Sequence, residues 1–245
     1  MDYLQGQRLL TTVLLDEKDH KISDGIYHRF QIDLAYNSDR MEGNCLTYEQ
    51  VKALFDTGTI SDESARVDDI IETVNHFRCF DHILDTLDEP LSEGYIKELH
   101  RMLKTGTLSS RSEEAVIGEY KKYANEVGDV KTALPEEVHD QMVSLLDEYN
   151  GLSDVTLEDI VSFHVRFEKI HPFYDGNGRI GRLIMVRECL KNKITPFVIS
   201  DNEKIFYYMG LKEWQTEDKH QRLMSLCELS QMDMEKILEY FGISF

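Results

Sequence analysis

Apolar residues recur at helical spacing along most of the chain. The clearest patterns place them three and four positions apart, which puts them on one face of an α-helix. They run over residues 67–80, 157–170, 180–190 and 234–241. Runs that alternate apolar and polar residues, typical of strands, are nearly absent. We therefore predict an all-α protein of about eight helices.

Prolines and glycines divide this pattern. Ser92 marks the start of a helix over about residues 92–104, and Pro135 starts another, since proline is tolerated in a first turn. Residues 117–133 differ, because short β-prone runs flank Gly128 there. That stretch predicts a small β-hairpin. No repeat or linker divides the chain, so one compact helical domain is the simplest account.

Charge and composition narrow the partners. The chain has 27 basic and 46 acidic residues, a net charge of −19. We expect no nucleic-acid partner, because a polyphosphate would be repelled by most of the surface. We also expect no membrane partner, since no apolar run approaches the ~18–20 residues that a span needs. Four scattered cysteines and the lack of a secretory signal indicate a cytoplasmic protein.

A glycine-rich turn separates two of the helical patterns. The first helix should end at His171, because the residue before a proline is pushed out of the α region. The next helix follows a turn sequence, and its first N–H groups lack intrahelical partners. The turn therefore predicts an anion site, where Gly176 and Gly178 allow close backbone approach and Asn177 supplies an amide donor.

Charged residues beside this turn indicate its chemistry. Arg179 and Arg182 lie three apart on one helix face, and their planar groups suit phosphate oxygens. Asp175 is a hard oxygen ligand for Mg²⁺. His171, neutral near pH 7, can accept the proton of an attacking hydroxyl. Each feature alone is usually structural, but their conjunction predicts phosphoryl or nucleotidyl transfer.

Residues 171–182 match the pattern HPFxDGNGRxxR at every specified position. This segment resembles the signature of Fic-domain proteins, and similarity at Gly118, Tyr120 and Tyr207 extends the likeness over about residues 90–215. The resemblance implies a Fic fold, all-α with a small β-hairpin flap near the active site. We expect residues 1–60 to form an N-terminal helical region and residues 61–245 the catalytic core and C-terminal helices.

The resemblance also implies roles for single residues. His171 would be the base that deprotonates a Ser, Thr or Tyr hydroxyl of a target protein, and Asp175 would hold Mg²⁺. The flap would clamp the target by strand-like pairing, and Lys121 stands where the family usually has Arg. ATP would contact Gly176, Asn177, Gly178, Arg179, Arg182, Tyr207 and Tyr208.

A second motif lies near the N-terminus. The segment from Ser38 to Gly43 resembles the family's inhibitory motif [S/T]xxxE[G/N]. Ser38 and Glu42 are four apart, so they share a helix face, and Gly43 ends the helix. The resemblance implies that Glu42 pairs with Arg182 in place of the γ-phosphate. The alternative is an ordinary surface glutamate before a helix end.

These observations predict a protein adenylyltransferase. It would transfer AMP from ATP to Ser, Thr or Tyr hydroxyls, label itself, and be autoinhibited by Glu42. Three alternatives stay open: a hydrolase that uses Glu42 to remove AMP, transfer of another phosphate-linked group, and a non-catalytic nucleotide-sensing interaction module. The sequence leaves open the target and the choice between monomer and homodimer.

Overall fold

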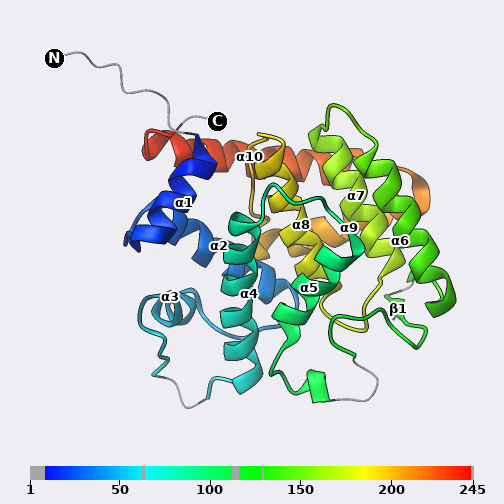
Figure 1. Cartoon of the computed structure of the whole chain (residues 1–245), viewed down its shortest axis with the longest axis horizontal. Helices are drawn as coiled ribbons and strands as arrows, with labels where there is room; N and C mark the ends of the chain where they lie inside the picture. The colour runs from blue at the N-terminus through cyan, green and yellow to red at the C-terminus, as the bar shows by residue number, and fades with distance from the viewer. Residues whose placement is uncertain (1–8, 62–63, 112–115, 129, 244–245) are drawn as a thin grey trace.

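The structure is a computed structural model that describes residues 9–61, 64–111, 116–128 and 130–243. Helices make up nearly all the regular structure of these residues (Figure 1), so the all-α prediction is confirmed. The α-helices, in chain order, are α1 (Leu10–His20), α2 (Ile26–Met41), α3 (Tyr48–Thr57), α4 (Val67–Asp85), α5 (Glu93–Lys104), α6 (Pro135–Asn150), α7 (Leu157–Ile170), α8 (Asn177–Lys191), α9 (Lys204–Glu217) and α10 (Gln221–Tyr240). Two 3-10 turns, η1 (Ser109–Arg111) and η2 (Asp201–Glu203), accompany them.

The described residues contain ten α-helices rather than about eight. The excess is explained by helices without a one-sided apolar pattern. In α9, Ile205, Phe206 and Met209 are exposed while Tyr207 and Leu211 are buried. Apolar residues on several sides of a helix give no clear 3.6-residue period. None of the described helices is long and apolar enough to cross a membrane.

Helix α8 lies inside the bundle and carries the second half of the glycine-rich segment. It packs against α7, α2, α4 and α5, and its residues from Arg179 to Leu190 are all buried. A helix buried on every side has no solvent face for its charged residues. The arginines at its N-terminal end therefore point toward other helices and must find partners there.

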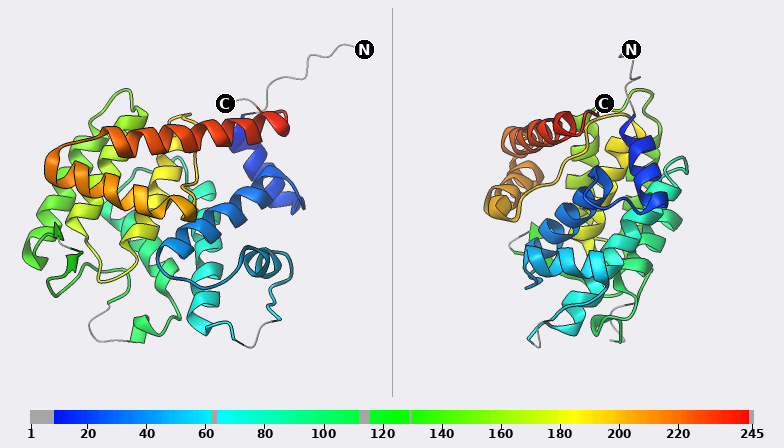
Figure 2. Two further views of the ribbon diagram at one scale, coloured as in Figure 1. Left: turned by 180° about the vertical axis from the view of Figure 1, so that it is seen from behind. Right: turned by 90° about the vertical axis from the view of Figure 1, so that its left-hand side faces the viewer.

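The N-terminal helices share the main apolar core with the rest of the chain. Leu14 of α1 and Phe30 of α2 belong to the same buried cluster as Phe167 of α7 and Leu183 of α8. This packing brings the C-terminal end of α2 to the first turns of α8. Figure 2 shows α9 and α10 side by side along one side of the molecule.

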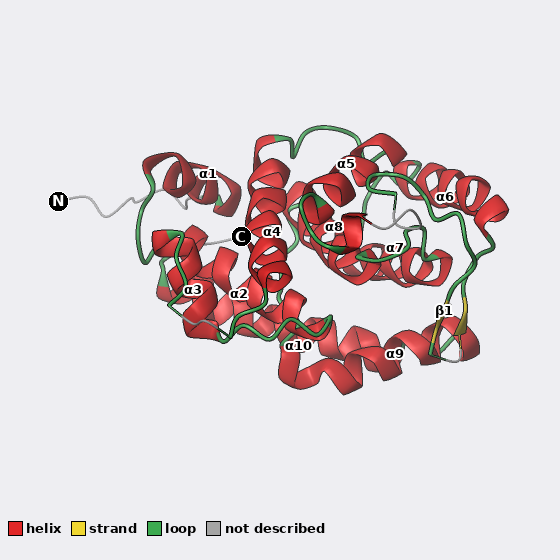
Figure 3. Ribbon diagram, turned by 90° about the horizontal axis from the view of Figure 1, so that it is seen from below, coloured by secondary structure: helices red, strands yellow, loops and turns green. Residues whose placement is uncertain are grey.

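The β-structure is much smaller than the hairpin expected over residues 118–133. Strands β1 (Glu126–Val127) and β2 (Val130–Lys131) are two residues each and pair antiparallel, Glu126 with Lys131 and Val127 with Val130 (Figure 3). The other described residues of this stretch form loops and turns. Lys121 contacts the Ile170 carbonyl at the end of α7 and donates its backbone N–H to the Pro172 carbonyl, so hydrogen bonds outside a β-ladder hold this loop.

Candidate active site

The turn between α7 and α8 is held in a fixed conformation. His171 ends α7 with φ of 52°, a left-handed conformation that is uncommon for a residue with a side chain. Gly176 precedes α8 with φ of 87°, where glycine is favoured. The Asn177 side chain accepts from the N–H of Phe173 and donates to its carbonyl, both at 2.9 Å. Asn177 therefore fastens the turn, and one of the two N–H groups of its amide is used for this contact.

His100 of α5 contacts the same turn through its ring. Its ring stacks on Phe173, with centroids 3.9 Å apart. Nδ1 accepts from the N–H of Gly118 at 2.9 Å, which leaves Nε2 to donate to the Asp175 carbonyl at 3.0 Å. Burial lowers the pKa of His100 to about 4 and keeps the ring neutral. Nothing in the sequence marks His100, because a histidine on an amphipathic helix carries no distinctive signal.

His171 has the properties of a neutral base. Burial and the nearby Lys121 ammonium lower its pKa to about 4, so the imidazole is uncharged near neutral pH. Its Nδ1 is buried and interacts with the backbone of Glu168. The other ring nitrogen, Nε2, is therefore the one left to accept a proton from an incoming group.

Lys121 ties the flap loop to the turn. Its N–H donates to the Pro172 carbonyl at 2.8 Å, and its Nζ donates to Asn125 and Thr132, each at 2.7 Å. The same ammonium also lies 3.3 Å from the Ile170 carbonyl. Burial lowers the pKa of Lys121 to about 8. This residue therefore works as a structural anchor between the loop and the end of α7.

Asp175 lies at the mouth of the site, and its two oxygens contact different cations. Oδ2 accepts from Lys104 Nζ at 2.6 Å, and Oδ1 lies 3.5 Å from Arg179 Nη2. Burial disfavours its ionised form, but Arg179 and Lys104 outweigh burial and hold the pKa of this carboxyl below its usual range. One ionised, partly exposed carboxylate fits Mg²⁺, which takes one or two carboxylates and completes its shell with water and phosphate.

Arg179 is enclosed by acidic side chains. It is 2% exposed, and its Nη1 lies 2.6 Å from Glu72 Oε2 on α4 and 3.9 Å from Asp39 Oδ1 on α2. The position of Arg179 beside the glycine-rich turn predicts that its guanidinium contacts phosphate. In the structure its charge is instead balanced by Glu72, Asp39 and Asp175.

Arg182 faces the end of α2. Its Nη2 donates to Glu42 Oε1 at 2.6 Å and to the Ser38 carbonyl at 2.9 Å, and its Nε donates to Ser38 Oγ at 3.1 Å. A Cβ at Gly178 would overlap the Glu42 carboxylate, so that carboxylate lies against the first turn of α8. Burial opposes its ionisation, but Arg182 outweighs burial and lowers the pKa of Glu42.

The second motif has the local form predicted for it. Helix α2 ends at Met41, Glu42 is its C-terminal cap, and Gly43 has φ of 92°. Ser38 and Glu42 both reach Arg182, as their shared helix face predicts. Ser38 is 2% exposed, whereas 28% of the Glu42 side chain is accessible.

The neighbouring tyrosines of α9 differ in position. Tyr207 is fully buried, and its hydroxyl lies 2.5 Å from His164 Nε2 on α7. Tyr207 is thus a core residue. It is not among the residues that line the pocket beside Tyr208, although the sequence predicts that both tyrosines contact ATP. Tyr208 does line a pocket of about 380 Å³, bounded by α7, α9 and the β2 strand. The carboxyl of Glu168 also lines this pocket, and burial raises its pKa to about 8.

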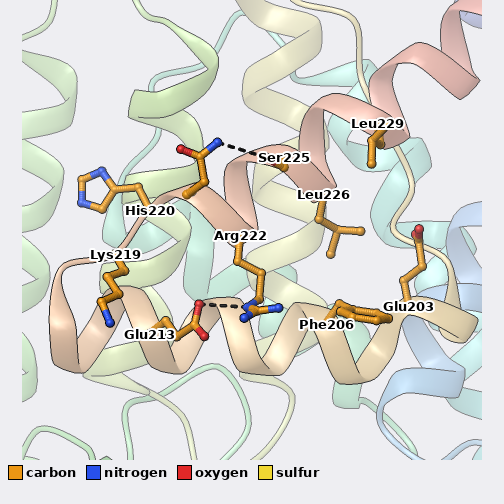
Figure 4. Close-up of a pocket in the computed structure, with 10 residues that line it drawn as sticks. Glu203, Phe206, Glu213, Lys219, His220, Arg222, Ser225, Leu226 and Leu229 are labelled. Atoms are coloured by element: carbon orange, nitrogen blue, oxygen red, sulfur yellow. Dashed lines mark hydrogen bonds and ion pairs between the residues drawn. The ribbon is translucent and has the colours of Figure 1, made fainter.

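A larger pocket, of about 830 Å³, lies between α9 and α10 (Figure 4). Phe206, Leu226 and Leu229 supply its apolar part, and Glu213 pairs with Arg222 on its floor at 2.9 Å. No residue of the segment 171–182 lines it. Its size therefore does not make it part of the site built on α7 and α8.

The chain is similar in sequence to known proteins over the segment that carries this site. The Fic/DOC family model matches residues 90–189. The protein adenylyltransferase fic-1 of Caenorhabditis elegans is 24% identical over 184 residues, 72% of this chain and 35% of that protein. The chain thus spans about a third of that relative's length. A probable protein adenylyltransferase of Aquifex aeolicus is 40% identical over 60 residues, 24% of this chain and 18% of that protein.

A crystal structure extends the likeness to the whole fold. A Fic domain containing signaling protein from Bacteroides thetaiotaomicron superposes with a TM-score of 0.76 at 25% identity, covering 95% of each chain. The family match includes the complete turn between α7 and α8, and the relatives above are protein adenylyltransferases. Residues 90–189 of this chain therefore form a Fic/DOC family domain.

Proposed function

We propose that this protein transfers AMP from ATP to hydroxyl groups of proteins, and that Glu42 restrains the reaction. The observation that carries the proposal is the neutral imidazole of His171 beside the N-terminus of α8. A purely binding module needs the anion site but no base. The kinship with protein adenylyltransferases supports AMP as the transferred group.

The reaction follows from these groups. His171 accepts the proton of a Ser, Thr or Tyr hydroxyl, and the hydroxyl oxygen forms a bond to the α-phosphorus of ATP. The bond from that phosphorus to the bridging oxygen breaks, pyrophosphate leaves, and AMP remains on the target as a phosphodiester. The N–H groups at the start of α8 stabilise the negative charge that develops.

Asp175 would hold the Mg²⁺ that accompanies ATP and neutralises phosphate charge. The nucleoside would occupy the pocket between α7, α9 and β2, where Tyr208 lies. The open ladder edges of β1 and β2 suit pairing with an extended target segment.

Glu42 would act by occupying Arg182. An ionised carboxylate bound to this guanidinium takes the place of a terminal phosphate, so ATP binds in a pose that does not react. Removing the carboxylate frees Arg182 without touching the base or Asp175.

The test uses ATP labelled at the α- or the γ-phosphate, with Mg²⁺, and compares wild type, Glu42→Gly and His171→Ala. We expect α-label on protein, more with Glu42→Gly, and none with His171→Ala. Glu217→Gly, at the exposed end of α9, is the matched control and should label like wild type. Transfer of γ-label alone would overturn AMP transfer in favour of a kinase, and equal labelling by wild type and Glu42→Gly would overturn the restraint.

A hydrolase that removes AMP is the second candidate. It is favoured by the partial exposure and the lowered pKa of Glu42, because an ionised, accessible carboxylate can orient a water molecule. Incubating AMP-labelled protein with wild type and Glu42→Gly separates the two, since only wild type would release AMP.

A further inference from the structure

Lys104 is a buried ammonium that pairs with Asp175, the predicted metal ligand. It is the last residue of α5 and is 3% exposed. Its Nζ donates to Asp175 Oδ2 at 2.6 Å and to Glu72 Oε1 on α4. A buried ammonium requires such pairing, because burial of an unpaired charge is costly.

Glu72 gives this ammonium a second partner that does not depend on Asp175. One Glu72 oxygen accepts from Lys104, and the other lies 2.6 Å from Arg179 Nη1. Only 15% of the Glu72 side chain is accessible. Lys104 can therefore leave Asp175 and stay paired with Glu72.

Hydrogen bonds hold the backbone around Lys104 in place. Thr107 Oγ1 donates to the Lys104 carbonyl at 2.9 Å. The Asn75 side chain of α4 donates to the carbonyls of Leu103 and Thr105, at 3.0 and 2.8 Å. From this fixed backbone the Lys104 side chain reaches both the Asp175 and the Glu72 carboxylate.

We propose that Lys104 competes with a divalent metal ion for Asp175 and so makes metal binding depend on nucleotide. The proposal rests on the proposed function in taking Asp175 as the metal ligand. A divalent cation on either oxygen of the Asp175 carboxylate would lie within a few Å of the Lys104 ammonium, and the repulsion between two such cations is strong at this distance. A metal ion that binds Asp175 without nucleotide must displace the Lys104 ammonium toward Glu72. There the ammonium lies closer to the positive charge of Arg179, which also pairs with Glu72. A metal ion that arrives bound to triphosphate brings negative charge with it, and this charge offsets the repulsion between the metal ion and the two cationic side chains.

The test is Mn²⁺ binding to the full chain without nucleotide, measured by the electron paramagnetic resonance signal of free Mn²⁺. Lys104→Met should bind Mn²⁺ at least about tenfold more tightly than wild type, while Lys104→Arg, which keeps the charge, should bind as wild type does. Asp175→Asn in the Lys104→Met background should abolish the gain. Lys97→Met, on the same helix but paired with Glu119, is the matched control and should change nothing.

Lys104→Gln covers the case in which Lys104→Met does not fold, because its amide can still donate to both carboxylates without a charge. Mn²⁺ affinity in the folded variant that is no higher than in wild type would overturn the proposal. A gain that survives Asp175→Asn would overturn it as well. Since Mn²⁺ binding needs no AMP transfer, a chain that shows these shifts but transfers no AMP would overturn the proposed function alone.

Discussion

Arg179 and Arg182 leave the same helix one turn apart, yet they meet opposite surroundings. Arg179 points to α4 and α2, where Glu72, Asp39 and Asp175 enclose it. Arg182 points to the end of α2, where one carboxylate, that of Glu42, pairs with it and stays partly accessible. The first arginine is balanced by a closed network of charges. The second is held by a group that can turn away, so of the two it suits control by a movable contact.

The largest expected effect is the loss of Arg179. Arg179→Met should lower the free energy of unfolding by about 3–5 kcal/mol, because it leaves the buried Asp39 without its cation and Glu72 paired with Lys104 alone. Arg182→Met should cost roughly 1–2 kcal/mol, since Glu42 can turn to solvent and only the Ser38 contacts are lost. Urea unfolding measures both, with Arg166→Met on the surface as the control. Equal losses at the two positions would contradict the comparison.

Gly181 lies between the two arginines, and its substitution tests how closely α8 must approach α7. A Cβ there would lie 2.5 Å from Nδ1 of His164. His164 is 1% exposed, and its Nε2 is hydrogen-bonded to the Tyr207 hydroxyl. Gly181→Ala should destabilise the protein by about 1–3 kcal/mol, because neither ring can move without opening the core. Gly94→Ala is the matched control. Its Cβ meets only Ser92 Oγ, at 3.9 Å, so it should be neutral or stabilising in urea unfolding.

Asp39 gives the smallest effect, and one that depends on pH. Burial raises its pKa to about 7, with Arg179 only partly offsetting burial. A carboxyl with a raised pKa takes up a proton on folding, so its contribution to stability is present below about pH 4 and is lost as pH rises through 7. Asp39→Asn resembles the protonated form and should stabilise the protein at pH 8.5 by at least about 1 kcal/mol.

Thermal unfolding of Asp39→Asn and wild type at pH 5 and pH 8.5 measures this difference. Near pH 5 the two should unfold at closely similar temperatures, because Asp39 is then mostly protonated in the folded state. A gain of the same size at both pH values would show that the effect comes from packing rather than from ionisation. It would also place Asp39 outside the charge network around Arg179.

Much of the local structure could be predicted from the sequence. The apolar period marked α4, α7, α8 and α10, and Pro135 marked the start of α6, because these signals depend only on neighbouring residues. The helix, turn and helix order around residue 175 followed from the proline and glycine positions. Family membership rested on the same contiguous segment, which the comparisons bear out.

The partners of the charged residues could not be predicted in this way. Helical spacing states which side of its own helix a residue occupies, but not which helix faces that side. Glu72 and Lys104 come from α4 and α5, and they reach the turn only because those helices pack on each other and on α8. Neither residue stood out in the sequence, since single charges on helices are usually solvated.

Tyr207 and Tyr208 show the same division. They are adjacent and chemically identical, and the sequence offered no reason to separate them. The packing of α9 against α7 buries the first on His164 and leaves the second beside a pocket. The sequence by itself thus determined the helices, the anion-binding turn and the residue types around it. The tertiary structure alone decided which charges meet, because that depends on contacts between helices distant along the chain.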